Sequence, residues 1–240
     1  MEPPTRSPPL ANQPVLLAIG AHYDDCIYGI PGIMLKAIAK NYRVVILSLI
    51  GDYSNWPPVR GRDRELVEQT ILLSREYGAE MQFLDLASHQ YVVDEQTKRK
   101  VSEAVHAVKP DIAFHLWEYD HHNDHTVASQ LSKIALRGGG RVINEDRFKT
   151  PSRIYQYDNG PGHTIGFEPD TFVDVTEHWD RAIAWLGRLM AIMQNREYDP
   201  EQPGGAERNK EILARYRGNT CGVQFAEALW SARKRPVEIL

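Results

Sequence analysis

The sequence is short of cysteine, of net charge and of long apolar runs. Its 240 residues include two cysteines, Cys26 and Cys221, which are too few for a disulfide framework and indicate reduced thiols in a cytoplasmic protein. A net charge of −4 gives no electrostatic reason to expect a nucleic-acid partner. No apolar run is long enough to cross a bilayer, so we expect no membrane span. The N-terminal segment MEPPTRSPP lacks the apolar core of a signal peptide, so export is not expected.

The composition is that of a globular protein. Hydrophobic residues make up 42% and charged residues 25% of the chain, which argues against disorder. The length suits one well-buried domain. We therefore predict a flexible arm over residues 1–13 and a single domain over residues 14–240. The oligomeric state stays open, and a homo-oligomer is compatible with the composition.

Short apolar runs alternate with helical patterns over the first 140 residues or so. The predicted strands are Val15–Ile19, Val44–Leu49, Met81–Leu86 and Ile112–Trp117. The predicted helices are Gly32–Lys40, Arg62–Tyr77, Asp94–Lys109 and Asn123–Arg137. This alternation predicts an α/β fold, with a Rossmann-like, mostly parallel sheet and helices on both faces. Ligands of such sheets bind beyond the carboxyl ends of the strands.

The remaining chain has a different pattern. Two further strands are predicted at Arg153–Asp158 and Phe172–Val175, on either side of the Gly/Pro-rich loop Asn159–His163. Helices are predicted at Glu177–Asn195 and Phe225–Lys234, with the polar segment Glu197–Gly205 between them. These elements complete the single predicted domain.

Two clusters of ionisable residues follow the first and fourth predicted strands. The segment Ala21–Asp25 reads AHYDD, and the segment His121–His125 reads HHNDH. Because both strands end at one edge of a parallel sheet, the clusters are expected to meet there. Two histidines and a carboxylate from separate loops suit a catalytic zinc ion, which keeps a fourth position open.

The spacing within each cluster suits metal-assisted hydrolysis. His122 and His125 lie three apart at a helix start, so both can face one cavity. Asp24 and Asp25 are neighbours, and the side chains of neighbouring residues diverge. One carboxylate can bind metal while the other transfers a proton, a division of roles that this chemistry requires.

These residues resemble a known family. The stretch Gly20–Gly32 resembles the Ala-His-Pro-Asp-Asp-Glu motif of the PIG-L/LmbE family of zinc-dependent N-acetylglucosaminyl deacetylases. The stretch His122–His125 resembles the family's His-x-Asp-His motif, and the order and spacing of the two motifs match. Phe172–Thr176 and Gly222–Glu227 are similar to later family segments, so the resemblance covers most of the chain beyond the arm.

The resemblance implies a role for each matched residue. The implied zinc ligands are His22, Asp25 and His125. Asp24 would be the general base that takes a proton from water. His122 would stabilise the oxyanion, and Asp124 would orient His122 by a hydrogen bond. A helix-start carboxylate such as Asp124 can also simply complement the helix dipole.

The sequence departs from the family pattern at two positions. Tyr23 replaces the usual proline and Cys26 the common glutamate, which changes the expected shape of the pocket but not the ligand set. Arg62 and Glu65 are candidates for the family's Arg-x-x-Glu pair. Three residues are ambiguous between packing and substrate contact: Tyr53, Trp56 and His163.

We therefore expect a hydrolase that removes an acetyl group from an N-acetylglucosamine-type sugar or sugar conjugate, with Zn²⁺ or another divalent metal as cofactor. The expected partner is a small N-acetylated sugar or conjugate. Two alternatives stay open: an amidase of a sugar–thiol conjugate, and a non-catalytic metal- or sugar-binding module on the same fold. A dinucleotide-binding enzyme is disfavoured, because the loop after the first strand lacks Gly-x-Gly-x-x-Gly.

Overall fold

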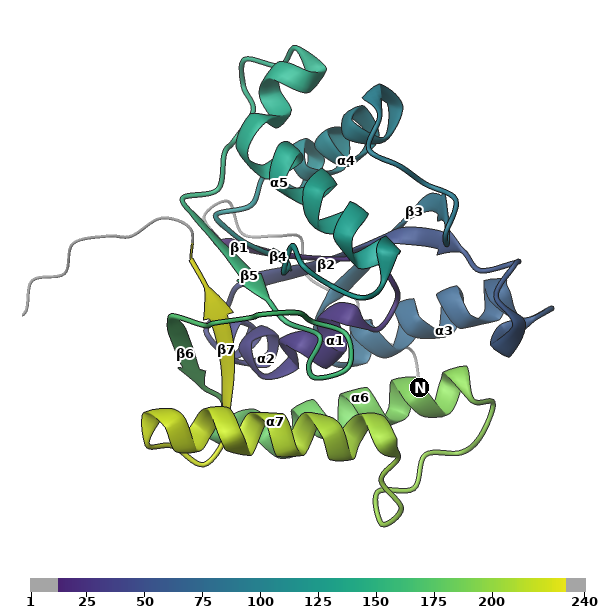
Figure 1. Ribbon diagram of the computed structural model, residues 1–240, viewed down its shortest axis with the longest axis vertical. Coiled ribbons are helices and arrows are strands. Elements are labelled where there is room, and N and C mark those ends of the chain that lie inside the picture. Colours follow the sequence, from purple (N-terminus) through teal and green to yellow (C-terminus); the bar gives the residue numbers. More distant parts are fainter. Residues whose placement is uncertain (1–12, 232–240) are drawn as a thin grey trace, which may run out of the picture.

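A twisted sheet forms the centre of the protein (Figure 1). The computed structural model describes residues 13–231, so the predicted arm lies almost wholly outside the described residues. Within them, seven strands pair in the order β3-β2-β1-β4-β5-β7-β6. The strands are β1 Val15–Gly20, β2 Arg43–Asp52, β3 Glu80–Ala87, β4 Ile112–Leu116, β5 Arg153–Tyr157, β6 Thr171–Asp174 and β7 Ala226–Trp230. The first five are parallel, and β7 is antiparallel to both of its neighbours.

Helices cover both faces of the sheet, as predicted. In chain order they are α1 Asp25–Gly29, α2 Pro31–Ala39, α3 Asp63–Glu76, α4 Glu95–Val108, α5 Asn123–Ile143, α6 Trp179–Met193 and α7 Gly205–Cys221. Helices α4 and α5 pack together on one face, whereas α1, α2 and α3 lie on the other, where α6 and α7 form an outer layer (Figure 1). Two short 3₁₀ helices, Pro57–Val59 and Thr176–His178, complete the elements.

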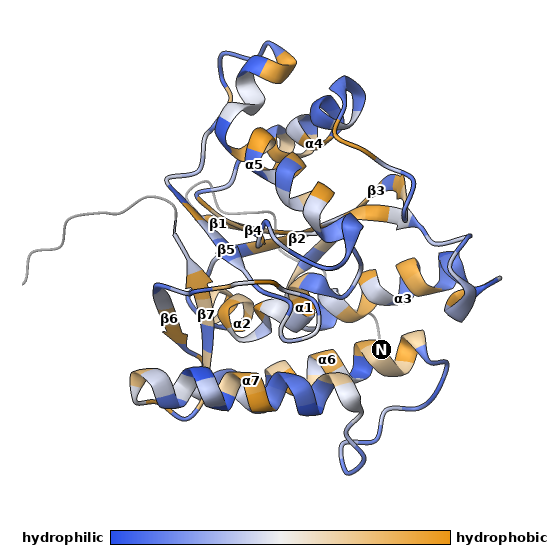
Figure 2. Ribbon diagram, viewed as in Figure 1, coloured by the Kyte–Doolittle hydropathy of each residue, from blue (hydrophilic) through white to orange (hydrophobic). Residues whose placement is uncertain are grey.

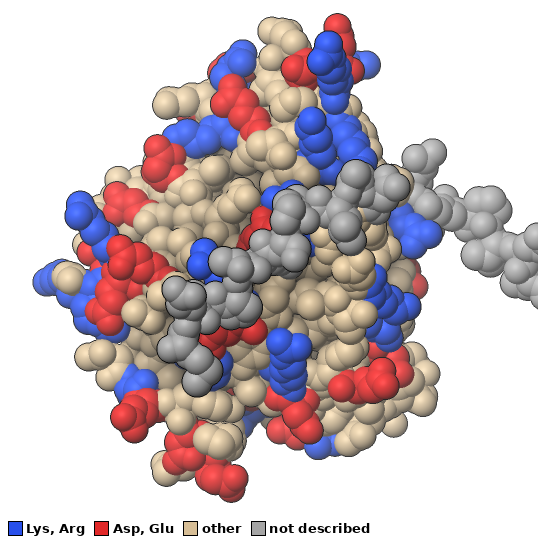
Figure 3. Space-filling model, turned by 180° about the vertical axis from the view of Figure 1, so that it is seen from behind, with Lys and Arg blue, Asp and Glu red and all other residues tan. Residues whose placement is uncertain are grey.

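The central strands are stable because helices bury the apolar side chains on both faces of the sheet. Leu17, Ala18 and Ile19 of β1 are fully buried, the pattern of a central parallel strand. Residue hydropathy changes from the centre of the fold to its outer layer. The central strands are hydrophobic, whereas α7 carries many hydrophilic residues (Figure 2). On the face seen in Figure 3, acidic and basic side chains are interspersed. None of the helices in the described part is long and apolar enough to span a membrane.

The C-terminal part corrects one sequence prediction. A helix was predicted at Phe225–Lys234, but the described part of this segment contains strand β7, which fills the gap between β5 and β6. Its helix-favouring residues are overridden by pairing along both edges. Helix α7 was not predicted, because its buried side includes the charged residues Glu207 and Lys210, so hydrophobic periodicity is weak.

The strand order places a crevice where both sequence clusters lie. The chain runs from β1 outward through β2 and β3, and then returns to β4 on the other side of β1. Strands β1 and β4 are therefore neighbours in parallel register, with Ile19 beside His115. The loops that leave their carboxyl ends diverge to opposite faces, which opens the binding crevice of α/β sheets. His115 itself is buried within β4.

Candidate metal centre and active site

The loop after β1 folds around the carboxylate of Asp25. Its Oδ2 accepts hydrogen bonds from the backbone N–H groups of Ala21 and His22, at 2.7 and 2.8 Å. Gly20 is required here, because a Cβ at that position would lie 2.8 Å from the Cβ of Asp25. The other oxygen, Oδ1, accepts a 2.8 Å hydrogen bond from the side-chain amide of Asn159. The turn thus holds Asp25 in one orientation.

The loop after β4 is organised by Asp120. Its Oδ1 accepts a 2.7 Å hydrogen bond from the backbone N–H of His122, the residue that caps the N-terminus of α5. His125 follows in the first turn of α5 and is buried. The rings of His122 and His125 stack with centroids 4.8 Å apart, so both face the same cavity, as their spacing predicts.

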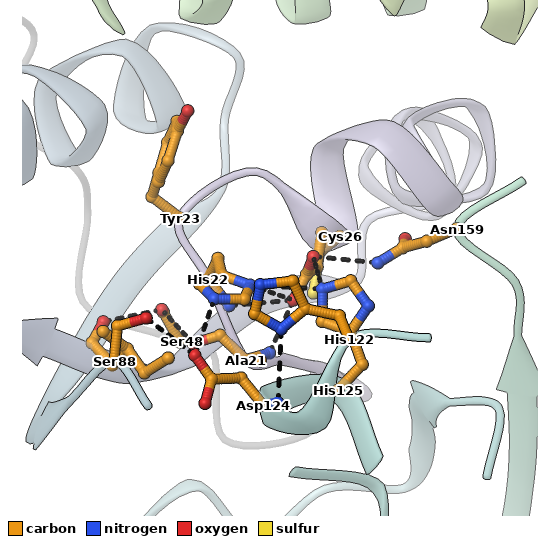
Figure 4. Close-up of polar contacts among 12 residues, drawn as sticks. Ala21, His22, Tyr23, Cys26, Ser48, Ser88, His122, Asp124, His125 and Asn159 are labelled. Carbon is orange, nitrogen blue, oxygen red and sulfur yellow. Dashed lines mark hydrogen bonds and ion pairs between the residues drawn. The ribbon is translucent and has the colours of Figure 1, made fainter. Parts of the chain in front are cut away.

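The three residues predicted to bind metal converge. Figure 4 shows the rings of two of them, His22 and His125, close to one another. Nδ1 of His22 lies 3.2 Å from Nε2 of His125. Nε2 of His125 lies 3.1 Å from Oδ1 of Asp25, and Nδ1 of His22 lies 3.7 Å from Oδ2 of Asp25. Two nitrogens on a tetrahedral zinc ion at about 2.0–2.1 Å would be roughly 3.3 Å apart. The donor types and their spacing therefore fit a divalent metal ion.

A carboxylate oxygen lies close to the outer nitrogen of each of these histidines, with hydrogen-bond geometry at His22 but not at His125. Oδ2 of Asp124 lies 3.1 Å from Nε2 of His22, and Oδ2 of Asp120 lies 3.1 Å from Nδ1 of His125. Carboxylates in this position fix the tautomer of metal-binding histidines and raise their basicity. The prediction that the Asp124 side chain orients His122 needs correcting, because its carboxylate contacts His22 instead. Asp124 contacts His122 only through its backbone N–H, which donates to Nδ1 of His122 at 3.2 Å. The side chain of Asp124 points across to the β1 loop because Ser88 and the N–H of His89 also bind its oxygens.

The surrounding carboxylates favour positive charge at the two converging histidines. Burial by itself lowers the pKa of His22, but its contacts with Asp124 and Asp25 outweigh burial and raise that pKa to about 9. The pKa of His125 is raised to about 10, because Asp25 and Asp120 outweigh burial in the same way. Burial opposes ionisation of Asp25, yet the charge and hydrogen bonds of His125 and His22 hold its pKa well below the usual value. The carboxylates around His22 and His125 thus favour a cation at this position.

The pKa values of Asp24 and His122 shift in the opposite directions to those of Asp25 and of the histidines His22 and His125. Burial, followed by the charge of Asp25, raises the pKa of Asp24 to about 6. Burial and then the charges of His22 and His125 lower the pKa of His122 to about 4. Because Nδ1 of His122 accepts a hydrogen bond, its neutral ring carries the proton on Nε2. Neutral His122 can therefore still donate a hydrogen bond.

Three residues near the centre escaped the sequence analysis. Asp120 lies two residues before His122, and Asn159 opens the Gly/Pro-rich loop after β5; both contact predicted ligands. His89 follows β3 in a left-handed conformation, with φ of 60°, and its ring stacks on His122 at 5.0 Å. Each follows a strand that ends at the same sheet edge, which is the signal that pointed to the two clusters.

A pocket of about 460 Å³ opens over the centre. It is lined by the loops after β1, β2, β3 and β5 and by the starts of α5 and α7. Tyr53, Trp56 and His163, whose roles were ambiguous, all line it. Tyr53 is nevertheless almost fully buried, and its hydroxyl accepts a hydrogen bond from the N–H of Tyr23, which a proline there would lack. Arg62 instead binds Glu65 and the carbonyl of Ile192, and does not line the pocket.

The match to a known family agrees with this geometry. The family model described as GlcNAc-PI de-N-acetylase, PIG-L, matches residues 17–136, which is half of the chain. The chain belongs to the PIG-L family. The matched segment includes both ionisable clusters and the strands β1 and β4 that carry them. The family match therefore covers the part of the chain that forms the centre.

The chain is also similar to several individual proteins. A 4-oxalmesaconate hydratase of Pseudomonas putida is 22% identical over 181 residues, covering 70% of each chain. The crystal structure of a conserved protein of Thermus thermophilus has a TM-score of 0.76 at 24% identity, covering 93% of this chain and 97% of that one. The N,N'-diacetylchitobiose deacetylase of Pyrococcus horikoshii has a TM-score of 0.72 at 17% identity, covering 92% and 84%. At these identities the structures establish a common fold.

Proposed function

We propose that the protein is a zinc-dependent hydrolase that removes the acetyl group of an N-acetylglucosamine-type sugar or sugar conjugate. The observation that carries this proposal is the placement of Asp24 beside the converging side chains of His22, Asp25 and His125. Asp24 and Asp25 are adjacent, yet the pKa of Asp24 is raised to about 6 while that of Asp25 is lowered. One carboxylate thus suits metal binding, and its neighbour suits proton transfer.

The zinc ion would be held by His22, Asp25 and His125. When bound, it would supply Lewis acidity that polarises the amide carbonyl and acidifies a water molecule. In the proposed reaction, Asp24 accepts a proton as the water oxygen bonds to the carbonyl carbon. Nε2–H of His122 donates a hydrogen bond to the carbonyl oxygen as negative charge develops there. The C–N bond then breaks, the proton passes from Asp24 to the amine, and acetate and the free amino sugar leave.

The walls of the pocket support a sugar-like substrate. Trp56 and Tyr28 present aromatic surface, of the kind that packs against the apolar face of a pyranose ring. Ser88, Asn159 and Asn209 add hydroxyl and amide groups that can exchange hydrogen bonds with sugar hydroxyls. The pocket volume of about 460 Å³ is enough for a small glycoside.

The proposal is tested by acetate release from a panel of N-acetylated compounds, measured with zinc-loaded protein. The panel contains N-acetylglucosamine, its methyl glycoside, an N-acetylglucosamine disaccharide and a sugar–thiol conjugate, with an N-acetyl amino acid as the negative control. We expect turnover of at least one sugar compound and none of the amino acid. No acetate or amine release from any sugar compound would refute the proposed function, and cleavage of only the thiol conjugate would identify the amidase alternative.

Asp24→Asn tests the assigned base within the same assay. We expect it to keep its zinc and to lose about 10²–10⁴-fold in kcat, because proton transfer by a positioned group contributes about that much. Asp52→Asn is the matched control, since Asp52 is an exposed carboxylate at the end of β2 and does not line the pocket. An Asp24→Asn protein that loses zinc but keeps its rate per bound metal would show that Asp24 and Asp25 are assigned the wrong way round.

Hydration of an unsaturated carboxylate is the second candidate, and the relative from Pseudomonas putida favours it. Against it, none of the described residues that line the pocket is lysine or arginine, the usual partners of a substrate carboxylate. Loss of the ultraviolet absorbance of an unsaturated dicarboxylate on incubation with the protein would favour hydration. Acetate release without that loss favours the deacetylase.

A further inference from the structure

His89, the second residue after β3, has a backbone conformation that L-residues rarely adopt. Its φ is 60°, in the left-handed region. The other described non-glycine residues with positive φ lie at a helix C-cap or one residue beyond it, where this conformation is common; they are Asn41, Lys109, Asn144 and Asn195. His89 follows a strand instead. Such a residue persists only where its surroundings determine it, and such residues cluster at active sites.

The loop that contains His89 is fastened to the start of α5. The backbone N–H of His89 donates to Oδ1 of Asp124 at 3.0 Å, and the hydroxyl of Ser88 donates to Oδ2 at 2.7 Å. The side chain of Asp124 is 3% exposed, and Figure 4 shows it in contact with Ser88. The left-handed turn is therefore held by a buried carboxylate in the first turn of the helix that His122 caps.

The side chain of His89 is 66% exposed, so burial does not explain its position. Its imidazole stacks on that of His122, with ring centroids 5.0 Å apart and planes 22° apart. This is the offset arrangement that aromatic rings prefer. Both rings line the pocket. The turn thus places an otherwise exposed ring against the residue that we assign to the carbonyl oxygen of the substrate.

The plane of the His122 ring needs such a contact. Among the described residues, its ring accepts one hydrogen bond, from the backbone N–H of Asp124 to Nδ1 at 3.2 Å. One bond fixes a point of the ring, whereas rotation about the last side-chain torsion of histidine has a broad minimum. The rings of His22 and His125 also contact His122, but both residues are proposed metal ligands. His89 is not a proposed ligand, and its ring lies nearly parallel to that of His122.

We propose that His89 is a positioning residue for His122: it holds the imidazole plane so that Nε2–H is directed at the substrate carbonyl oxygen. The proposal rests on the role of His122 in the proposed function, but not on the identity of the sugar. Stacked aromatic pairs contribute an amount that corresponds to about 2–10-fold in a rate. We expect a loss of that size in kcat when the His89 ring is removed.

The test compares His89→Asn with His121→Asn. Asparagine accepts the left-handed conformation, so it keeps the backbone N–H on Asp124 and removes only the ring. His89→Gly, which also accepts positive φ, is a second variant in case the first does not fold. His121 is the matched control, because it is an exposed histidine next to His122 that does not line the pocket.

We expect kcat and kcat/KM of His89→Asn to fall equally, by about 2–10-fold, with zinc affinity as in wild type. His121→Asn should match wild type in each. In a His122→Ala background, His89→Asn should cost nothing further, because its effect passes through the missing ring. An equal loss in that background would overturn the proposal and show that His89 acts on the substrate itself. A kcat equal to that of His121→Asn, or a parallel loss of zinc affinity, would also overturn it.

A second measurement needs no substrate. NMR relaxation of ¹³C-labelled histidine rings gives the order parameter of the Cδ2–H bond of His122. We expect it to be lower in His89→Asn than in wild type and in His121→Asn, and an unchanged value would overturn the proposal. Failure of the wild type to release acetate from sugars would refute the proposed function, and this measurement would still decide whether His89 holds His122.

Discussion

Lys210 and Glu227 form a buried ion pair between α7 and β7, and breaking it should destabilise the fold. Nζ of Lys210, in α7, lies 3.1 Å from Oε1 of Glu227 in β7, and the two side chains are 3% and 0% exposed. The ammonium group also donates to the carbonyl of Gly29 at 2.8 Å, at the end of the short helix that begins with Asp25. Glu227 accepts the N–H groups of Gly32 and Ile33 at the start of α2.

Lys210→Met would leave the Glu227 carboxylate buried without its cation. Removing one partner of a buried pair typically costs about 3–5 kcal/mol. The loss of a donor to the Gly29 carbonyl adds about 1 kcal/mol, and the two retained N–H groups at the α2 N-terminus offset about as much. We therefore expect the free energy of unfolding to fall by about 3–5 kcal/mol. For a chain of this size that lowers Tm by roughly 6–20 °C.

Urea unfolding followed by circular dichroism, with thermal scans, measures the effect. Lys133→Met is the matched control, because Lys133 pairs with Glu118 at 3.2 Å but is 54% exposed, and it should cost at most about 1 kcal/mol. The double variant Lys210→Met/Glu227→Gln, which removes both charges, should be more stable than the sum of the two single losses predicts. A Lys210→Met loss no larger than that of Lys133→Met would refute the reasoning.

Three further predictions concern individual histidines. His125→Ala should lose the bound metal in elemental analysis, because a predicted ligand is removed. Unchanged metal content would refute the proposed metal site. His122→Ala should keep zinc but lose about 10²-fold in kcat, and a near-normal kcat would exclude its role at the carbonyl oxygen. Burial lowers the pKa of His115 to about 3, so below its unfolded pKa of 6.5 the unfolded chain binds the extra proton. Stability should fall by about 1.4 kcal/mol per pH unit below about 6.5 from this group, and His115→Leu should show a shallower slope in urea titrations; an equal slope would contradict the assignment.

The sequence alone was sufficient for the first five strands and for placing the two ionisable clusters at one edge of the sheet. Runs such as Val15–Ile19 are apolar on both sides, and only a central strand or a buried helix accepts that pattern; their length and spacing decide for strands. Once the strands are parallel, the ends of β1 and β4 must share an edge. That is why His22 and His125, which are 103 positions apart, could be assigned to one site from the order of the strands.

The C-terminal region could not be predicted in the same way, because its elements depend on charges that pair in three dimensions. Glu207 and Lys210 are polar in sequence but buried in the fold, so α7 shows little hydrophobic periodicity. Residues 226–230 favour a helix locally, yet both of their edges are paired by β5 and β6. In each case partners distant in sequence outweigh local preference.

Within the site, residue types were readable from the sequence, whereas contacts were not. The spacing of His122 and His125 is a property of a helix, and it holds wherever the helix lies. Which carboxylate faces which imidazole depends on how two loops meet, since a carboxylate binds whichever donor the backbone brings within about 3 Å. Sequence therefore determined the chemistry available at this sheet edge, and tertiary structure alone decided that Asp124 holds His22, Asp120 lies beside His125 and Asn159 holds Asp25.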